Sequence, residues 1–442
     1  MPARDQTDGA VQTMALIAIH TLGSRGDVEP LLALGRRPKA RGHRVRFATA
    51  PRFEEVVTST GLDFSPLPGD LIDLIGTPEG KAALSGTGLA RIKARISLAR
   101  GLAPMARRLL AAEQAAGVGA DLLVYHPKAF GGPHIAEWLG IPSFVTLPLP
   151  VLTPTRAFPR PILPFAGLGP LNSFSHRLVA WFSDIAVRAP VNELRRDRLG
   201  LGPSKVGMWG DRRQTPRLHA FSRAVVPVPK DWGEADHVTG YRFAEPDRNW
   251  TPSASLADFL ASGPPRVHVG FGSLPTEDAA QMTALVGAAL ARCGQRGTLA
   301  TDWGGMADSP QGSSIHILRE ARHDWLFPRM AAVVHHGGAG TTAAGLKAGR
   351  PTSMCPFFGD QPFWGRRVSA LGAGPPPLPF ASLTVERLAE AIARTVSTPS
   401  LGSRAAELGR AISAEDGVGA AADLITAALE TATAAHRQSS VS

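Results

Sequence analysis

The stretch RMAAVVHHGGAGTTAAGLKAGRPTSMCPFFGDQPFWG, residues 329–365, decides the fold. Its apolar run AAVV predicts a strand buried on both faces, and TTAAGLKAG predicts the helix that follows. Between them, HHGGAG forms a turn of small residues at the carboxyl end of the strand. Glycines at such a turn let a ligand approach free backbone N–H groups, so the turn predicts an anion site. Glycines that only permit tight packing are the ordinary alternative.

The same alternation of strand and helix extends along most of the chain. MALIAI, residues 14–19, is followed by the helix-like DVEPLLALGRRPKARGH and by the strand-like RVRFATA. A second series starts at RVHVGFGS, residues 266–273. This spacing predicts an α/β protein with two Rossmann-like halves, parallel sheets, and a ligand at the carboxyl ends of the strands. Pro38 falls inside the first helix, which we expect to end or kink there.

The chain divides into two domains and four shorter segments. The linker is placed where proline, tryptophan and charge concentrate before the second series. Prolines also recur between residues 148 and 170, which predicts a lid; no acid lies between Glu137 and Asp184, so the lid suits an apolar ligand. We expect a disordered tail over 1–13, an N-terminal domain over 14–226, a linker over 227–250, a C-terminal domain over 251–414, a helix over 415–432 crossing back to the N-terminal domain, and a disordered tail over 433–442.

Composition excludes several classes of protein. The 47 basic and 37 acidic residues give a net charge of +10, but no dense basic run carries interleaved aromatics, which argues against nucleic-acid binding. Cys293 and Cys355 are far apart, which argues against a disulfide scaffold and a zinc site. The first 13 residues lack the apolar core of a signal peptide, and no stretch approaches the roughly 20 apolar residues that span a bilayer. We expect a cytoplasmic protein.

The segment PFFGDQPFWGRRV places Asp360 and Gln361 one strand beyond the glycine-rich turn, and a carboxylate with an amide suits sugar hydroxyls. With these residues, the opening stretch resembles the nucleotide-sugar motif of the UDP-glycosyltransferase superfamily, in its sterol glucosyltransferase-like branch, whose bacterial relatives include antibiotic glycosyltransferases. LGSRGDVEPLLALG, GGPHIAEWLGIP, VHVGFGSLPTED and HDWLFPRMAAVVHH are similar to the same branch, in the family's order. The resemblance implies a GT-B fold with an interdomain cleft, and inverting glycosyl transfer without a required metal or cofactor.

The resemblance also implies a donor site. His336 would contact the proximal phosphate of a nucleoside diphosphate sugar, and the turn after it the distal phosphate. The implied residues are His336, Gly338, Gly340, Thr341 and Ser273 at the diphosphate, Trp303, Arg322 and His323 at the uracil or thymine, and Asp360 and Gln361 at the sugar.

Two residues are candidates for the catalytic group that removes the acceptor's proton, one as the base and one as its partner. Asp27 lies at the start of the first helix, where the branch carries an aspartate that acts as general base; by itself, the position is typical of a helix cap, and both roles can coexist. His126 ends the strand DLLVYH, where plant relatives carry the aspartate that supports a catalytic histidine. We therefore expect a reversed acid–imidazole pair. His20 and His134 are interpreted as core histidines.

A basic run over residues 91–108 has two interpretations. It contains Arg91, Lys93, Arg95, Arg100, Arg107 and Arg108, with no acid between Lys81 and Ala112. The ordinary interpretation is a solvated helix face. The alternative is a peripheral contact with an anionic membrane that supplies a lipid-like acceptor.

The resemblance favours transfer of a hexose from UDP-glucose to a hydroxyl of an apolar small molecule, which could be sterol-like, a lipid or a natural product. A dTDP-deoxysugar donor is the first alternative. A catalytically inactive auxiliary protein that binds nucleotide sugars is an alternative of another class. A dehydrogenase is disfavoured because LGSRGD lacks the GxGxxG spacing after the first strand.

Overall fold

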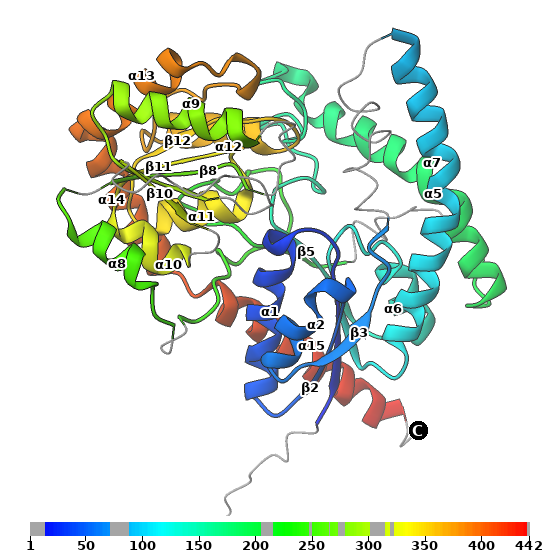
Figure 1. The fold of residues 1–442 in the computed structure, drawn as a ribbon. Helices are drawn as coiled ribbons and strands as arrows, with labels where there is room; N and C mark the ends of the chain where they lie inside the picture. Colours follow the sequence, from blue (N-terminus) through cyan, green and yellow to red (C-terminus); the bar gives the residue numbers. More distant parts are fainter. Residues whose placement is uncertain are drawn as a thin grey trace, which may run out of the picture.

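Two sheets of parallel strands form the two halves of the molecule (Figure 1). The computed structural model describes residues 14–70, 88–204, 215–246, 250–264, 266–272, 279–300, 314–318 and 322–439. The N-terminal sheet has the strand order β3-β2-β1-β4-β5-β6-β7, and the C-terminal sheet has the order β10-β9-β8-β11-β12. The prediction of an α/β protein with two Rossmann-like halves is confirmed.

The two central strands of the N-terminal sheet, β1 and β4, are short apolar runs; β1 is buried along most of its length and β4 along all of it. The elements of this half are β1 (Leu16–His20), α1 (Arg25–Ala40), β2 (Arg44–Thr49), η1 (Pro51–Phe53), α2 (Glu54–Ser59), β3 (Asp63–Pro66), α5 (Gly88–Gly117), β4 (Leu122–Tyr125), α6 (Gly132–Leu139), β5 (Ser143–Leu147), η3 (Gly169–Leu171), α7 (Asn172–Asp197), β6 (Arg217–His219) and β7 (Asp236–Val238).

In the C-terminal half, helices cover both faces of the sheet, with α9 and α13 on one side and α10 and α11 on the other (Figure 1). Its elements are α8 (Ala254–Ala261), β8 (Arg266–Gly270), α9 (Ala279–Arg292), β9 (Gly297–Ala300), β10 (Ile315–Leu318), α10 (His323–Leu326), η5 (Phe327–Arg329), β11 (Met330–His335), α11 (Ala339–Lys347), β12 (Thr352–Met354), α12 (Gln361–Ala370), η6 (Phe380–Ser382), α13 (Val385–Ser397) and α14 (Pro399–Ser413).

Each sheet has one point where the strand order reverses. In the N-terminal sheet this point lies between β1 and β4, and in the C-terminal sheet between β8 and β11. Connections leave the two strands at such a point in opposite directions, so a crevice opens beyond their carboxyl ends, and ligands of α/β proteins bind there. A ligand-binding site is therefore expected at the turns that follow these four strands.

The last helix, α15 (Gly417–Ser439), returns from the C-terminal half and packs beside α1 (Figure 1). Ala421, Ala422, Ile425 and Leu429 of α15 belong to the main hydrophobic core of the N-terminal half. At the surface, Arg41 forms an ion pair with Asp423, and Arg37 Nη2 lies 3.3 Å from Asp416 Oδ2. The chain end thus joins the two halves.

Two boundaries differ from the sequence expectations. The segment 433–439 continues α15 instead of forming a disordered tail, because its alanines, arginine and glutamine are strong helix formers. The span expected as linker contains β7, which pairs with β6 at the edge of the N-terminal sheet. A strand of three residues is too short to show a periodic pattern. The expected tail over 1–13 lies outside the described residues.

The first helix does not end at Pro38. It runs to Ala40, with Pro38 buried in its last turn. The Pro38 carbonyl accepts hydrogen bonds from the N–H groups of Arg41 and His43, both at 3.1 Å. A proline this close to the carboxyl end removes one helical hydrogen bond and leaves the rest of the helix intact.

Candidate active site

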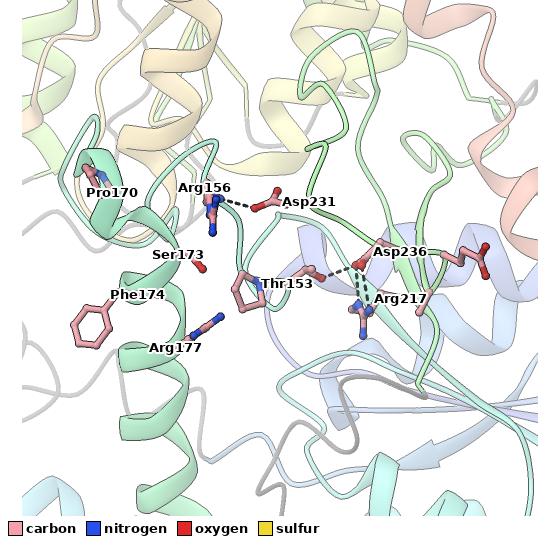
Figure 2. A pocket seen from close by; sticks show the side chains of 13 residues that line it. Thr153, Arg156, Pro170, Ser173, Phe174, Arg177, Arg217, Asp231 and Asp236 are labelled. Atoms are coloured by element: carbon pink, nitrogen blue, oxygen red, sulfur yellow. Dashed lines mark hydrogen bonds and ion pairs between the residues drawn. The ribbon is translucent and has the colours of Figure 1, made fainter.

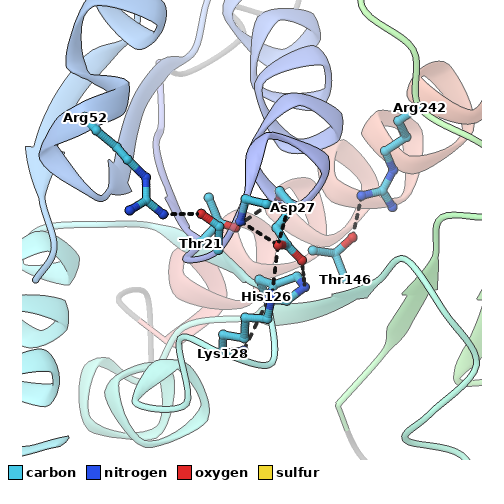
Figure 3. A network of polar contacts seen from close by, with 9 residues as sticks. Thr21, Asp27, Arg52, His126, Lys128, Thr146 and Arg242 are labelled. Atoms are coloured by element: carbon cyan, nitrogen blue, oxygen red, sulfur yellow. Dashed lines mark hydrogen bonds and ion pairs between the residues drawn. The ribbon is translucent and has the colours of Figure 1, made fainter. Parts of the chain in front are cut away.

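Asp27 lies in the first turn of α1, directly after β1. Its Oδ2 accepts hydrogen bonds from the backbone N–H and the hydroxyl of Ser24, at 2.8 and 3.1 Å. The turn itself is fixed from outside, because Arg52 Nη2 donates to the Gly23 carbonyl at 2.8 Å (Figure 3). Asp27 therefore caps the helix, and its capping role leaves Oδ1 for other partners.

Two side chains from the turn after β4 converge on the same carboxylate (Figure 3). Lys128 Nζ lies 2.8 Å from Asp27 Oδ2, and His126 Nε2 lies 3.4 Å from Asp27 Oδ1. The backbone N–H of Lys128 donates to His126 Nδ1 at 3.2 Å. An imidazole that accepts at Nδ1 and is neutral carries its proton on Nε2, so the proton faces Asp27. The expected acid–imidazole pair is thus close enough to interact.

The charges of this group are fixed by its surroundings. Burial raises the pKa of Asp27, but the positive charge of Lys128, the His126 imidazole and the Ser24 N–H more than offset it, and the pKa lies below its usual value. Burial lowers the pKa of His126 to about 4, although the charge of Asp27 opposes the shift. At neutral pH the pair is therefore a carboxylate and a neutral imidazole. A carboxylate of this kind is a weak base that depends on positioning.

Two further charged residues near this site, Lys128 and Arg242, are not predicted from the sequence. Lys128 stands two residues after His126, and the parallel pairing of β4 with β1 brings it to Asp27. Arg242 is buried, its Nη1 lies 2.5 Å from Thr146 Oγ1 at the end of β5, and burial lowers its pKa to about 9 (Figure 3). Both contacts join segments about a hundred residues apart in the sequence, and no local sequence pattern predicts them.

On the other side of the cleft, the glycine-rich turn connects β11 with α11. His335 is fully buried, and its Nδ1 accepts from the N–H of Gly337 at 2.9 Å, so this histidine shapes the turn. Gly337 has a φ of +95°, a conformation that side chains with a Cβ rarely adopt. Gly338 precedes the first residue of α11. The turn thus aims the start of α11 at the cleft.

The His336 imidazole lies between two glycines. A Cβ on Gly338 would be 2.5 Å from His336 Nε2, and one on Gly272 would be 2.8 Å from Cε1. Burial lowers the pKa of His336 to about 4, against the opposing effect of the Gly270 carbonyl. Its Nδ1 is buried and has no hydrogen-bond partner among the described residues. A neutral ring in this position offers a phosphate a hydrogen bond rather than a charge.

Asp360 and Gln361 stand at the start of α12, next to the turn. Asp360 Oδ2 accepts from Trp364 Nε1 at 2.9 Å, and burial raises the pKa of Asp360, as does the charge of Asp27. Gln361 Oε1 accepts from the N–H of Phe357 at 2.8 Å, which leaves the amide N–H groups for another partner. A Cβ on Gly337 would lie 3.1 Å from the Gln361 carbonyl. The two predicted sugar-binding residues therefore adjoin the turn.

The remaining predicted donor residues lie at the rim or outside the described residues. His323 stacks on Phe327 with ring centroids 4.3 Å apart, and burial lowers its pKa to about 4. Arg322 pairs with Asp324 through two contacts of 3.0 and 2.9 Å. Thr341, in the first turn of α11, is half-buried. Ser273 and Trp303 fall outside the described residues.

The amino ends of α1 and α11 meet where the two halves adjoin. A Cβ on Gly340 would lie 3.7 Å from the Cα of Gly26, and the two helices are in contact. The charge of Asp27 acts on Asp360, and that of Arg25 on His323, so the two groups of residues share one electrostatic environment. The structure thus brings the predicted base and the anion turn together.

Among the described residues, no group of three His, Cys, Asp or Glu side chains could hold a metal ion. Within the same residues, no helix has the length and apolar character needed to cross a bilayer.

Two family models match the chain. The Glycosyltransferase family 28 N-terminal domain matches residues 17–159, and the Erythromycin biosynthesis protein CIII-like, C-terminal domain matches residues 322–418. These matches cover the Asp27 and His126 turns in the first domain and the His336 turn and Asp360 in the second.

Curated relatives extend the match over nearly the whole chain. Sterol 3-beta-glucosyltransferase UGT80A2 of Arabidopsis thaliana is 37% identical over 92% of this chain and 64% of its own length. A sterol 3-beta-glucosyltransferase of Emericella nidulans is 35% identical over 96% of this chain and 31% of its own length. The chain thus spans about two thirds of the plant relative and about a third of the fungal one. The O-mycaminosyltylonolide 6-deoxyallosyltransferase of Streptomyces fradiae is 37% identical over 95% of this chain and 99% of its own length.

Solved structures share the fold. The glycotransferase of kitacinnamycin has a TM-score of 0.69 at 21% identity and covers 94% of this chain and 100% of its own. The glycosyltransferase VinC in complex with dTDP has a TM-score of 0.63 at 18% identity, over 94% of this chain and 100% of its own. The chain belongs to the glycosyltransferase family that includes the sterol 3-beta-glucosyltransferases and the antibiotic glycosyltransferases of Streptomyces, and it has their GT-B fold.

Proposed function

We propose that this chain transfers a hexose from a nucleoside diphosphate sugar to a hydroxyl of an apolar small molecule, with inversion at the anomeric carbon and without a metal. The observation that carries the proposal is the meeting of two helix ends across the cleft, one holding the Asp27 carboxylate and the other the His336 turn. A base and an anion site at this separation serve the two ends of one displacement reaction.

Asp27 takes the proton of the acceptor. Oδ2 is held by Ser24 and Lys128, so Oδ1 receives the acceptor hydroxyl. The hydroxyl oxygen attacks the anomeric carbon from the face opposite the leaving diphosphate, and its proton passes to Oδ1. His126, whose Nε2 lies 3.4 Å from Oδ1, stays neutral throughout and takes no proton in this step. His126 is a positioning residue, because it holds the carboxylate and does not touch the substrate.

The α11 turn receives the leaving group. The departing diphosphate gains negative charge in the transition state, and preoriented donors stabilise this charge without reorganisation. The backbone N–H groups at the start of α11, the positive end of the helix dipole and the neutral ring of His336 supply them. Asp360 and the amide of Gln361 hold hydroxyls of the sugar. These groups do the work that a divalent cation does in other transferases.

UDP-glucose is the proposed donor, supported by the sterol 3-beta-glucosyltransferases at 35–37% identity. A dTDP-deoxysugar is the second candidate. The full-length match to a Streptomyces deoxyallosyltransferase and the fold shared with a dTDP-bound enzyme favour it. The acid-free segment between Glu137 and Asp184 supports an apolar acceptor for either donor.

The test is a donor panel crossed with an acceptor panel, read by mass spectrometry. UDP-glucose and dTDP-deoxysugars are each combined with sterols, lipids and polyketide aglycones. The proposal predicts a product heavier by one hexose, or by one deoxyhexose for the second candidate. Donor binding without product from any acceptor would contradict catalysis and favour an auxiliary binding protein.

A further inference from the structure

Exposed apolar side chains are concentrated on one helix and the loop before it. Thirteen large apolar side chains are exposed among the described residues, and eight of them lie between residues 162 and 185. Five lie on α7, one directly precedes this helix, and two belong to the loop before it. They are Leu171, Phe174, Leu178, Trp181, Phe182 and Ile185, with Ile162 and Phe165.

The first half of α7 reverses the polarity expected for a surface helix, whereas its second half buries Val191 and Leu194 in the core. Steps of three and four residues from Leu171 to Ile185 place these apolar side chains on one face, which is exposed. The buried positions of the same helix include Asn172, Ser175 and His176. Trp181 and Phe182 are 53% and 59% exposed and contact each other, with ring centroids 4.9 Å apart. This apolar face of α7 is therefore built to meet an apolar medium.

Charge indicates what that medium is. Between residues 138 and 192 the sequence has four arginines and one acid, Asp184, which is half-buried and has its own partner. Arg177 and Arg188 are exposed on α7, and neither forms an ion pair with a described residue. A second copy docked by two-fold symmetry would bring two copies of this basic, apolar face together, and Asp184 is the one acid that the segment supplies on either side. An anionic lipid surface complements both the apolar side chains and the arginines.

The lid over residues 148–170 contacts both α7 and α12. His176 of α7 bonds the Phe158 carbonyl at 3.2 Å through Nε2, and the Phe158 ring packs on Phe363 of α12 with centroids 5.6 Å apart. Arg366, also in α12, donates to the carbonyls of Pro164 and Phe165 at 3.2 and 3.0 Å. Since α12 begins at Gln361, the lid connects α7 to the helix that carries the predicted sugar-binding residues.

A groove of about 880 Å³ marks one end of the apolar face (Figure 2). On one side it is lined by Phe174 and Arg177 of α7, and on the other by the polar segment around Asp236. That far wall is already paired, since Arg217 Nε lies 2.6 Å from Asp236 Oδ1. The groove therefore separates the apolar face from a wall that faces water.

We propose that the exposed face of α7 docks on the surface of an anionic bilayer, with Trp181, Phe182 and Phe174 inserted at the level of the lipid headgroups, and that the apolar acceptor enters from the bilayer past the lid. This surface differs from the basic run of α5, whose Arg107 and Arg108 pair with Glu193 and Asp70. The acceptor route rests on the proposed function, whereas the docking itself does not.

The test is sedimentation of the full chain with vesicles of phosphatidylcholine, alone or with added phosphatidylglycerol. The wild type should bind the anionic vesicles and bind the neutral ones more weakly. The double variant Trp181→Ser, Phe182→Ser should lose about tenfold or more in lipid affinity, because it removes the inserted rings. Val118→Ser, at a residue that is 51% exposed outside the face, is the matched control and should bind like the wild type.

Two further readouts separate the possible failures. Brominated lipids should quench the tryptophan fluorescence of the wild type more than that of Trp181→Phe. No binding of the wild type to anionic vesicles, or equal binding by the double variant, would overturn docking; a dimer that the double variant breaks would assign the face to a second copy. Glycosyl transfer by the wild type to a water-soluble acceptor is measured in parallel. Vesicle binding without any such transfer would contradict the proposed function and leave the docking proposal standing.

Discussion

The carboxylate of Asp27 has a structural role and a proposed chemical role, and a single substitution separates them. Asp27→Asn keeps an oxygen that can accept the Ser24 hydrogen bonds, so the helix cap survives. It removes the base, and we expect kcat to fall by about 10²–10⁴. Affinity for UDP, measured by calorimetry, should not change. A variant with the kcat of the wild type would show that Asp27 only caps the helix.

Lys128 should set the pH range in which Asp27 is ionised. The ammonium group lowers the pKa of this carboxyl, so Lys128→Met should raise it and move the acidic limb of kcat/KM to higher pH. Lys128→Arg keeps the charge and should restore the wild-type profile. The measurement is kcat/KM against pH for the three proteins. Equal acidic limbs in all three would contradict the role given to Lys128.

At the scale of single residues, the sequence predicts the site residues that belong to a motif. It does not predict those that the fold brings to the site from elsewhere in the chain. Asp27 and His336 follow recognisable strand–turn–helix patterns. Lys128 has no such signal, because a lysine in a turn is typical of any surface. Its contact with Asp27 depends on β4 lying beside β1, which is a property of the sheet order.

At the scale of the element, the α11 turn offers a matched pair of substitutions. Gly338 has a φ of −61°, so alanine fits the backbone, but its Cβ would be 2.5 Å from His336 Nε2. Gly338→Ala should displace the imidazole and reduce kcat/KM for the donor by about 100-fold, the typical effect of losing one such hydrogen-bond donor.

The control is Gly340→Ala in the same helix. Its nearest neighbour would be the Cα of Gly26 at 3.7 Å, an ordinary contact. Donor kinetics close to those of the wild type are therefore expected. Similar losses in both variants would show that the helix start, rather than the ring of His336, responds to the substitution.

The length of an element decides how well its sequence predicts it. The continuous apolar runs of β1 and β11 predict these strands, and the helix-like stretches after them predict α1 and α11. The strands β6 and β7 have three residues each, too few to show the alternation of a strand, and the linker predicted over 227–250 therefore includes β7. Pro38 was expected to end α1, but near a carboxyl end the missing N–H costs only one bond.

For the whole molecule, buried histidines should make stability depend on pH. Burial lowers the pKa of six histidines to about 3 or 4: His20, His126, His176, His268, His323 and His336. Unfolded, each titrates near 6.5, so between about pH 6.5 and 4 the unfolded chain binds protons that the folded chain does not. Each group then reduces the free energy of unfolding by up to about 1.4 kcal/mol per pH unit.

Urea unfolding from pH 8 to pH 5 measures this effect. Stability should be nearly constant above about pH 7 and should fall below about 6.5 as the unfolded histidines gain protons. The low pKa of Asp27 acts in the same direction only at lower pH, since its contribution is lost as the pH falls through its folded pKa. Stability that rises between pH 7 and 5 would contradict the neutral state of these rings.

The crossing of α15 should make the N-terminal half depend on the end of the chain. Ile425 is 1% exposed in the core of that half, and Ile425→Ala should cost about 2–5 kcal/mol of unfolding free energy. Glu430→Ala, at an exposed position of the same helix, is the control and should change little. Equal midpoints of unfolding in the two variants would show that α15 does not stabilise that half.

The account as a whole depends on the α11 turn holding the donor diphosphate opposite Asp27. The most direct measurement is a crystal structure of the chain with UDP. We predict phosphate oxygens about 2.7–3.2 Å from the backbone N–H groups of residues 338–341 and from the ring of His336. UDP bound at another place, with the α11 turn empty, would contradict the account.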